Sequence, residues 1–419
     1  MPIAYQLSCP PAGLKGQITL EASKSLSNRA LIIQSLCATP FKIHQLSLSD
    51  DTRFLQKMLE SDEPILFAGH AGSSYRFMVA RACLGEKEVT LNASEQLRRR
   101  PIGPLVKALQ SLGADITYLN KEGFPPLKII PSKSFGTQSH EVTVQAGVSS
   151  QYITALLLIA PMLPNGLTLR RHGDLVSSSY IRMTLDMMTY FGVPHAWEGN
   201  TIRIEPCVYT AKEYTVEGDW SAASYYYSMA ALADQADVTI KGLSENSIQG
   251  DAVVKEIYSS LGVETTFTEN GIHIQKKAGK EKLKEYKFDF SSCPDIAQTV
   301  MVTLAGLGIK GILSGLRTLR IKETDRLLAM QTELARVKTT VLIKEEGQDI
   351  TAVIAGKAKW KDKAKVNTYE DHRMAMALAP LACIHPIMIK NPEVVSKSYP
   401  GFWNDISAAG IKLEKVKVK

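Results

Sequence analysis

One sequence pattern recurs six times along the 419 residues and constrains the fold more than any other feature. Each copy begins with polar or small residues, continues as a compact apolar helix rich in Ala, and ends in a β-rich run. Amphipathic helices, often followed by Gly, lie between the copies. The pattern predicts an α/β fold of six strand–helix–strand–helix–strand units with a period of roughly 60–80 residues. The apolar helices are expected to begin near Asn28, Gly72, Ser150, Ser221, Asp295 and Asp371.

Six similar units most simply form two lobes of three, with a cleft between the lobes as the natural ligand site. We expect residues 1–21 plus 217–419 to form a discontinuous first lobe and residues 22–216 to form the second. The earliest unit looks abbreviated, because residues 60–67 leave little room for a full strand pair.

Composition excludes several classes of protein. The first ten residues lack the basic and apolar regions of a signal peptide, and the longest apolar run is too short to cross a bilayer. Six cysteines are scattered without a CxxC motif, which argues against a zinc site or a disulfide framework and suits the cytoplasm. The net charge of +7 permits an anionic substrate without requiring one.

Cations stand near the starts of several apolar helices. We expect Arg29, Arg76 and Arg373 each to lie in a first turn. One such Arg would be explained by a salt bridge to a local Asp, but a buried helix otherwise has no reason to begin with a cation. Three on repeated units indicate helix N-termini that converge on phosphate or carboxylate groups, which Arg matches with two hydrogen bonds.

The segment Ile321-Lys322-Glu323-Thr324-Asp325-Arg326 precedes an amphipathic helix, with Thr324 or Asp325 as the expected N-cap. An Arg at a helix start opposes the helix dipole unless an anionic ligand binds there. Taken alone, the segment is better explained as a solvated cluster of salt bridges, but the similar starts of other helices in the chain favour a ligand. Asp295 and Glu323 lie at different helix starts, which suits separate base and acid roles in proton transfer.

Further cations lie outside the apolar helices. Arg98, Arg99 and Arg100 precede Pro101, which is expected to be the first residue of its helix, and Lys397 precedes the last helix. The sequence has no Walker A, GxGxxG, HExxH or GxSxG motif, so it suggests neither ATP, a dinucleotide nor a metal, and no cofactor is expected.

With these residues assembled, the chain resembles the 5-enolpyruvylshikimate-3-phosphate synthases over essentially its whole length. The resemblance implies two inside-out α/β barrel lobes, whose buried parallel helices point their N-termini into the interdomain cleft. It also implies that the lobes close on shikimate 3-phosphate and phosphoenolpyruvate. The motifs that carry it are residues 23–30 (SKSLSNRA), 71–73 (AGS), 100–103 (RPIG), 149–151 (SSQ), 175–177 (LVS), 322–326 (KETDR) and 371–375 (DHRMA).

The resemblance also implies roles for individual residues. Asp295 would take the proton of the shikimate 5-hydroxyl, and Glu323, with Lys24 contributing, would protonate the enol methylene. Shikimate 3-phosphate would be bound by Lys24, Ser25, Arg29, Ser149, Ser150, Gln151, Ser177, Asp295, Thr318 and Lys322. Phosphoenolpyruvate would be bound by Lys24, Gly72, Arg100, Gln151, Arg326, Arg373 and Lys397.

The chain departs from the family pattern at two positions. His70 stands where the family usually has Asn, and Thr318 stands where many members have Asn. The resemblance further implies inhibition by glyphosate in the phosphoenolpyruvate site, beside Gly72. We expect a monomer that binds neither nucleic acid nor membrane.

Three other functions fit the sequence less well. The sister enolpyruvyl transferase that acts on UDP-N-acetylglucosamine would need a loop Cys near Arg100, and none occurs between Cys83 and Cys207. An RNA-end-binding protein related to the RNA 3′-phosphate cyclases would favour a continuous basic stripe with aromatic residues. A non-catalytic binder of phosphorylated metabolites would leave Asp295 and Glu323 without a role.

Overall fold

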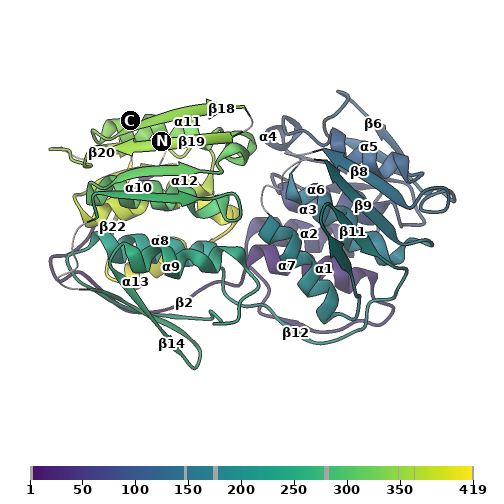
Figure 1. The fold of residues 1–419 in the computed structure, drawn as a ribbon, viewed down its shortest axis with the longest axis horizontal. Coiled ribbons are helices and arrows are strands. Elements are labelled where there is room, and N and C mark those ends of the chain that lie inside the picture. Colours follow the sequence, from purple (N-terminus) through teal and green to yellow (C-terminus); the bar gives the residue numbers. More distant parts are fainter. Residues whose placement is uncertain are drawn as a thin grey trace. The chain divides into compact units, whose positions relative to one another are not determined.

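The computed structural model of this chain describes residues 3–145, 149–172, 178–277, 283–347, 349–362 and 364–417. The chain divides into two compact units (Figure 1). Unit 1 consists of Met1–Ala22 and Glu217–Lys419, and unit 2 consists of Ser23–Val216. Each unit mixes helices with sheets, so the predicted α/β class is confirmed.

Each unit contains three helices that are buried on nearly all faces, and within each unit these helices pack on one another. Their apolar composition explains this, because a helix without a polar face is stable only when it is surrounded. In unit 2 they are α1 (Lys24–Leu36), α3 (Gly72–Ala82) and α6 (Ser150–Ile159). In unit 1 they are α8 (Trp220–Leu232), α10 (Ala297–Leu307) and α12 (His372–Leu378).

The remaining α-helices bury one face against the unit and expose the other; α2, for example, buries Leu55 and Met58. The N-cap of α2 is Ser49, and two acidic residues follow it, which is favourable at the positive end of the helix dipole. Unit 2 has α2 (Asp50–Glu60), α4 (Glu95–Arg98), α5 (Gly103–Ser111) and α7 (Ser178–Tyr190). Unit 1 has α9 (Val254–Ser260), α11 (Arg326–Arg336) and α13 (Phe402–Ala408). Six 3₁₀ helices are η1 (Ala160–Met162), η2 (Gly250–Val253), η3 (Pro294–Ile296), η4 (Arg317–Ile321), η5 (Ala379–Cys383) and η6 (Pro392–Lys397).

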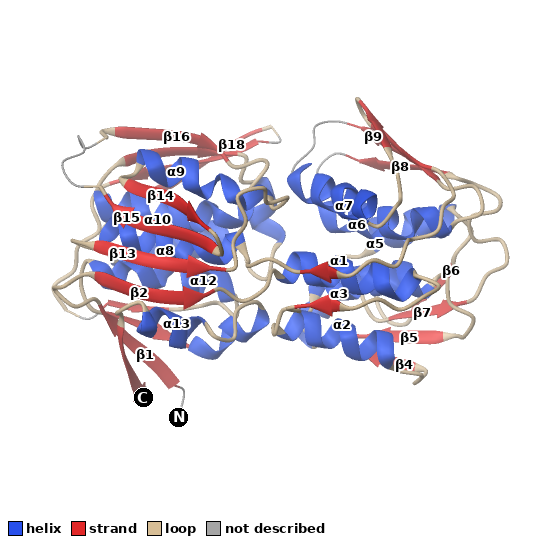
Figure 2. Cartoon of the chain, turned by 90° about the horizontal axis from the view of Figure 1, so that it is seen from below, coloured by secondary structure: helices blue, strands red, loops and turns tan. Residues whose placement is uncertain are grey.

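Five four-stranded sheets within the described residues share one topology (Figure 2). In each sheet, two neighbouring strands at one edge run parallel. The inner strand of this pair has an antiparallel neighbour on its other side, and that neighbour pairs with a further antiparallel strand at the opposite edge. The orders are β14-β15-β13-β2, β16-β17-β19-β18 and β20-β21-β1-β22 in unit 1, and β4-β5-β7-β6 and β10-β11-β9-β8 in unit 2. The orders that begin with β14 and β10 are written from the antiparallel edge, and the other three from the parallel pair. The predicted unit therefore lacked a strand, because a pair of antiparallel strands, not a single one, commonly follows the amphipathic helix.

The strands of unit 1 are β1 (Ile3–Ser8), β2 (Leu14–Thr19), β13 (Ala236–Lys241), β14 (Val263–Thr268), β15 (Gly271–Lys276), β16 (Glu285–Asp289), β17 (Lys310–Ser314), β18 (Thr340–Glu346), β19 (Asp349–Ala355), β20 (Ala364–Val366), β21 (Ile387–Lys390) and β22 (Lys412–Lys417). Those of unit 2 are β3 (Ile43–His44), β4 (Ile65–Phe67), β5 (Val89–Asn92), β6 (Asp115–Tyr118), β7 (Leu127–Ile130), β8 (Glu141–Gln145), β9 (Leu167–His172), β10 (Ala196–Glu198), β11 (Thr201–Ile204) and β12 (Tyr214–Thr215).

The sixth sheet is reduced to the parallel pair β3 and β12, each of two residues. After α2 the chain runs directly into β4, which joins the next sheet, so the antiparallel pair of the other copies is missing here. The earliest copy of the repeat is therefore abbreviated, as its sequence predicts.

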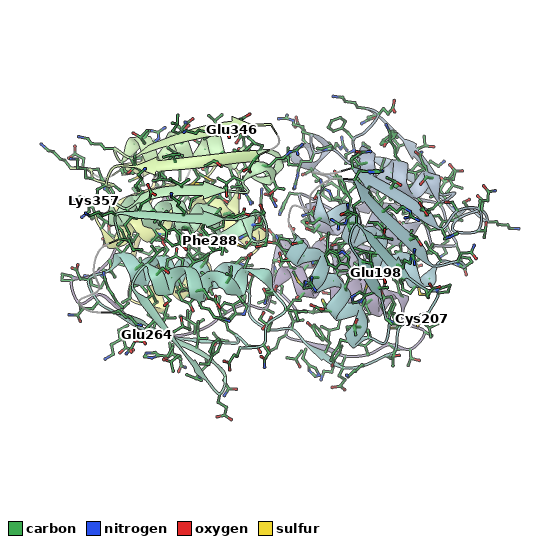
Figure 3. All side chains as sticks on the ribbon, viewed as in Figure 1. Glu198, Cys207, Glu264, Phe288, Glu346 and Lys357 are labelled. Carbon is green, nitrogen blue, oxygen red and sulfur yellow. The ribbon has the colours of Figure 1, made fainter. Side chains whose placement is uncertain are left out.

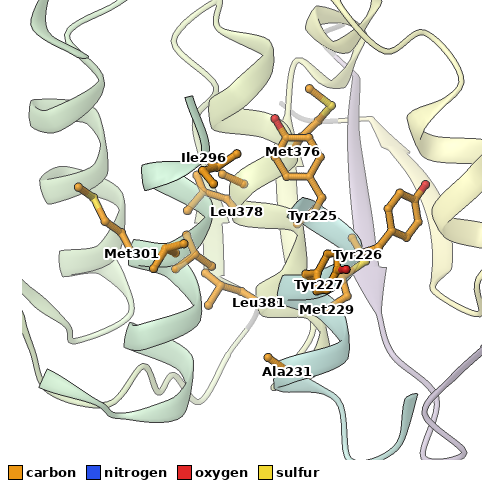
Figure 4. Close-up of a cluster of buried hydrophobic side chains, with 14 of the residues drawn as sticks. Tyr225, Tyr226, Tyr227, Met229, Ala231, Ile296, Met301, Met376, Leu378 and Leu381 are labelled. Atoms are coloured by element: carbon orange, nitrogen blue, oxygen red, sulfur yellow. The ribbon is translucent and has the colours of Figure 1, made fainter. Parts of the chain in front are cut away.

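Side chains sort by burial around these elements. In unit 1, α8 contributes Tyr225, Tyr226 and Met229 to a core that α10 and α12 complete with Met301 and Met376 (Figure 4). The outer faces of the sheets are polar, as the exposed Glu264 on β14 and Glu346 on β18 illustrate (Figure 3). The candidate functional side chains are therefore expected at the helix ends, because the helix bodies are largely apolar and the outer faces of the sheets are exposed to solvent.

Two expected helix starts are wrong. α1 begins at Lys24 with Ser23 as its N-cap, not near Asn28. Asn28 is buried within the helix, where it bonds to Ser74 and Thr52 on the two neighbouring helices. α5 begins at Gly103, not at Pro101, whose carbonyl instead accepts hydrogen bonds from Arg76 and Tyr152.

Candidate active site

In unit 1, the N-termini of the three buried helices meet around Asp295. This residue lies in η3, directly before α10. One carboxylate oxygen lies 3.2 Å from the Lys322 ammonium and 3.2 Å from the Arg326 guanidinium, and the other lies 3.1 Å from Arg373. Arg373 belongs to the first turn of α12, and its guanidinium also lies 3.4 Å from the hydroxyl of Ser221 on α8.

Arg326 holds the centre of this cluster. Its side chain is 2% exposed, and it bonds to Asp371 at 2.7 Å and to Glu323 at 2.7 Å as well as to Asp295. Burial alone would lower the pKa of Arg326, but the three carboxylates, Asp371 foremost, raise it above its usual value. Carboxylates of the protein therefore balance the buried charge of Arg326, so a ligand is not needed to explain a cation at this helix start.

The predicted segment before α11 folds as expected around its N-cap. Asp325 accepts hydrogen bonds from the backbone N–H groups of Leu327 and Leu328, each at 3.1 Å. Lys322 precedes the cap, and burial lowers the pKa of its ammonium while Asp295 opposes that shift. Asp295 and Glu323, predicted for separate roles, are brought together by the one guanidinium of Arg326.

Two predicted residues of unit 1 lie outside this cluster. The hydroxyl of Thr318, in η4, is buried and has no hydrogen-bond partner among the described residues. Lys397, at the end of η6, donates to the carbonyl of Glu370 at 2.7 Å, one residue before the N-cap of α12. Each could give a polar contact to a ligand bound near the helix ends.

Sequence reasoning missed the buried carboxyl of Asp251. It accepts a hydrogen bond from Ser221, the residue that also meets Arg373. Burial, reinforced by the negative charge of Asp295, raises the pKa of Asp251 to about 7. The position of Asp251 after Gly250, in the 3₁₀ helix η2, gives no signal in the sequence, because the groups that surround it come from distant parts of the chain.

In unit 2, Lys24 begins α1 and lies 3.3 Å from the carboxylate of Asp51 on α2. Asp51 also lies 4.0 Å from the ring of His70, one of the two positions that depart from the family pattern. The pair of acidic residues that opens α2 could have been flagged in the sequence, since it follows a Ser at an N-cap position. The backbone carbonyl of Ser25, the next residue of α1, accepts a hydrogen bond from Arg29 at 2.8 Å.

Arg29 is a buried cation with neutral partners. It donates to the hydroxyls of Thr184 at 2.8 Å and Thr154 at 3.3 Å and to the carbonyls of Ser25 and Tyr180. Burial lowers the pKa of Arg29 to about 10, which still leaves it charged at neutral pH. The residue lies in the second turn of α1, not in the first as expected, because the helix begins earlier.

Gly72 begins α3 between two guanidinium groups. A methyl group at this position would lie 2.6 Å from Arg100 and 2.7 Å from Arg76. Arg76 in turn donates to the carbonyl of Gly72 at 2.8 Å. The absent side chain thus makes room for these two arginines, and the expectation that a ligand packs against Gly72 stays a prediction.

The start of α6 completes the predicted set in unit 2. Ser149 is the N-cap and accepts from the N–H of Gln151, while Ser150 is the first helical residue. The amide nitrogen of Gln151 donates to Ser73 on α3 at 2.9 Å, and its amide oxygen is buried without a partner among the described residues. Ser177 lies outside the residues that the structure describes.

The arrangement in both units can bind anions and move protons. Within the described residues, no group of three or more His, Cys, Asp or Glu could hold a metal ion. In the same part of the chain, none of the helices combines the length and the apolar composition that a membrane span requires.

Known proteins are similar to this chain over nearly its whole length. Residues 53–406 match the sequence model of the EPSP synthase (3-phosphoshikimate 1-carboxyvinyltransferase) family. A 3-phosphoshikimate 1-carboxyvinyltransferase of Bacteroides fragilis is 43% identical over 413 residues, 98% of either chain. One of Aliivibrio fischeri is 35% identical and covers 95% of this chain and 97% of its own.

Solved structures show the same fold. An EPSP synthase from Acinetobacter baumannii superposes with a TM-score of 0.77 at 21% identity and covers 99% of this chain and 100% of its own. The fold, the converging helix starts and the sequence relatives agree, and the chain belongs to the EPSP synthase family.

Proposed function

We infer that the chain transfers the enolpyruvyl group of phosphoenolpyruvate to the 5-hydroxyl of shikimate 3-phosphate. The products are 5-enolpyruvylshikimate 3-phosphate and inorganic phosphate, and the reaction belongs to the shikimate pathway, which supplies chorismate for aromatic amino acids. The observation that carries this inference is the identity of 43% to a 3-phosphoshikimate 1-carboxyvinyltransferase over 98% of both chains.

The reaction is an addition followed by an elimination. Asp295 takes the proton of the 5-hydroxyl while the oxygen attacks the enol carbon, and Glu323, helped by Lys24, protonates the methylene carbon. Loss of a proton from the resulting methyl group of the tetrahedral intermediate then expels phosphate. The bonds from Arg326 to both carboxylates support this assignment, because they fix the two proton-transferring groups near each other.

Binding of the two anionic substrates is assigned to the helix starts. Shikimate 3-phosphate is held by Lys24, Ser25, Arg29, Ser149, Ser150, Gln151, Ser177, Thr318 and Lys322, and phosphoenolpyruvate by Lys24, Gly72, Arg100, Gln151, Arg326, Arg373 and Lys397. The open hydrogen-bonding capacity of Gln151 and Thr318 supports the assignment, since buried polar atoms normally have partners. Arg29 supports it too, because its hydrogen-bond partners among the described residues are hydroxyls and carbonyls, which leave its charge unbalanced.

We also propose that the two units are inside-out α/β lobes, residues 1–21 with 217–419 and residues 22–216, which close when substrates bind between their helix N-termini. Scattering with and without shikimate 3-phosphate tests this, and an unchanged radius of gyration would contradict it. Six free cysteines support a reducing cytoplasm as the place of action. All assigned residues come from one chain, so a monomer suffices.

Phosphate release tests the reaction directly. The purified protein should release phosphate only when phosphoenolpyruvate and shikimate 3-phosphate are both present, and mass spectrometry should find the enolpyruvyl product. Release with UDP-N-acetylglucosamine in place of shikimate 3-phosphate would point to the sister transferase. Binding of both ligands without release would leave a metabolite-binding protein.

A further inference from the structure

A buried glutamate on α11 has no part in the reaction proposed above. Glu333 is 0% exposed, and its carboxylate accepts hydrogen bonds from the side chain and the backbone N–H of Asn367, each at 3.2 Å. It also accepts from the hydroxyl of Tyr369 at 2.5 Å and pairs with Arg336 at 3.0 Å. Removing a carboxylate from water costs free energy, and these hydrogen-bond donors offset the loss of its hydration.

The segment that Glu333 holds has an unusual backbone. Tyr369 and Glu370 have φ angles of 53° and 54°, in the left-handed region that residues with side chains rarely adopt. Two such residues in succession are strained and persist only where the surrounding structure fixes them. The segment leads straight into Asp371, the N-cap of α12.

Both ends of this strained segment are attached to the same helix. Arg326 binds Asp371, and Glu333 binds Asn367 and Tyr369. Arg326 and Glu333 are seven residues apart, which is about two helical turns, so they lie on one face of α11.

The strained segment bears on two proposed contacts of phosphoenolpyruvate. The carboxylate of Asp371 accepts from the backbone N–H of Arg373 at 2.8 Å, and the carbonyl of Glu370 accepts from Lys397 at 2.7 Å. A change in the backbone at 369–370 would therefore move the anchor of each cation.

We propose that Glu333 is a positioning residue, which holds residues 367–371 in the strained conformation that places Arg373 and Lys397 for phosphoenolpyruvate. The inference rests on the function proposed above. Glu333 acts through Tyr369 and touches no substrate. Burial, reinforced by the bond to Glu333, raises the pKa of Tyr369 to about 12, so its hydroxyl remains a donor throughout the neutral range.

Tyr369→Phe is the sharpest test, because it removes one hydroxyl and keeps the ring. The KM for phosphoenolpyruvate should rise by about tenfold, as for loss of a hydrogen bond to a charged group, while the KM for shikimate 3-phosphate changes less than about twofold. Glu333→Gln should give the same pattern, and the double variant should be less than additive. Arg336→Gln is the matched control: it removes the partner that is 47% exposed, and it should leave both KM values unchanged.

Hydrogen–deuterium exchange gives a readout that needs no activity. Exchange should accelerate in peptides that cover residues 367–377 of Tyr369→Phe and stay unchanged in α11. Unaltered KM values and exchange would overturn the proposal, and so would equal losses for both substrates in proportion to a lower melting temperature. If the wild-type protein shows no turnover, the proposed reaction fails, and the exchange experiment alone then decides whether Glu333 positions the segment.

Discussion

At the scale of single residues, Glu323 is the most direct test of the chemistry. Glu323→Gln keeps the size of the side chain and an oxygen that can face Arg326, but it removes the proton donor. Turnover should fall by roughly 100-fold or more with little change in substrate binding, and deuterium uptake from solvent into the methyl group of the intermediate should fall with it.

Glu345→Gln is a suitable control for that variant, because Glu345 also pairs with an arginine, Arg320, but is 58% exposed. This control should retain normal turnover. Near-normal turnover of Glu323→Gln would instead mean that Glu323 has only a structural role, as the partner of Arg326 in a salt bridge.

Gly72→Ala tests the packing of the two arginines. The added methyl group would clash with the guanidinium groups of Arg76 and Arg100 and force them to move. Overpacking of this kind costs roughly 1–3 kcal/mol. The KM for phosphoenolpyruvate should rise. The inhibition constant for glyphosate should rise more, since the inhibitor is expected to reach farther toward this position. Gly103→Ala, where the nearest atom lies at 3.3 Å, is the control, and a common rise of both constants would make Gly72 only a turn residue.

The raised pKa of Asp251 predicts a pH-dependent stability. The folded protein keeps this proton up to about pH 7, whereas an ordinary Asp has a pKa of 3.8, so the folded state binds more protons between these two values. The contribution of Asp251 is therefore largest at low pH and is lost as pH rises toward 7, by about 2 kcal/mol between pH 5 and pH 7. Urea unfolding at pH 5 and pH 8 should show a flatter dependence for Asp251→Asn.

Asp237→Asn, on the exposed side of β13, provides the comparison for the pH experiment. Its pKa is lowered by a hydrogen bond to His273, so this variant should not flatten the dependence in the same direction. Equal pH dependence of wild type and Asp251→Asn would contradict the assignment.

Several residues of the candidate site could be predicted because their signal is local. Asp325 is recognisable as an N-cap from the residues beside it, and Gly72 from its place at a helix start. The partners of Arg326 could not be predicted. Asp371 is 45 residues away along the chain, and only the fold brings it within 2.7 Å. The same holds for Asp251, whose environment is made by distant elements.

At the scale of elements, the start of α11 can be tested through its cap. Asp325→Ala removes the acceptor for two backbone N–H groups and the 2.6 Å pair with Arg320, and it should lower the free energy of unfolding by about 1–2 kcal/mol. Asp325→Ser keeps a capping oxygen and loses only the pair, so it should recover most of that loss. Chemical denaturation of the three proteins compares them, and equal losses would mean that the pair with Arg320 dominates.

The misplaced start of α1 shows where sequence patterns are insufficient for an element. Polar residues at 23–29 look like a cap followed by an apolar helix, which put the expected start near Asn28. In the structure Ser27 and Asn28 are buried and bond to residues of other segments, so they belong to the helix body. Polarity near a helix start therefore has two meanings, and only the neighbours distinguish them.

For the whole molecule, charge should govern substrate capture. The cluster in unit 1 holds three cations and three carboxylates, whereas the candidate residues of unit 2 include Lys24, Arg29, Arg76 and Arg100. The KM for phosphoenolpyruvate should therefore rise as salt increases from about 0.01 M to about 0.1 M, over which the screening length falls from about 30 Å to about 10 Å. A KM independent of salt would contradict capture by a cation-rich site.

The position of β1 has a consequence for synthesis on the ribosome. β1 is made well before its two partners, β21 and β22, which follow more than 370 residues later in the chain. Residues 23–216 form a continuous segment that can finish folding while β1 and β2 still wait for the rest of unit 1. A nascent chain that stops before Ile387 would leave β1 as an unpaired, sticky edge. The sheet that contains β1 can therefore form only after the residues of β21 and β22 have been made.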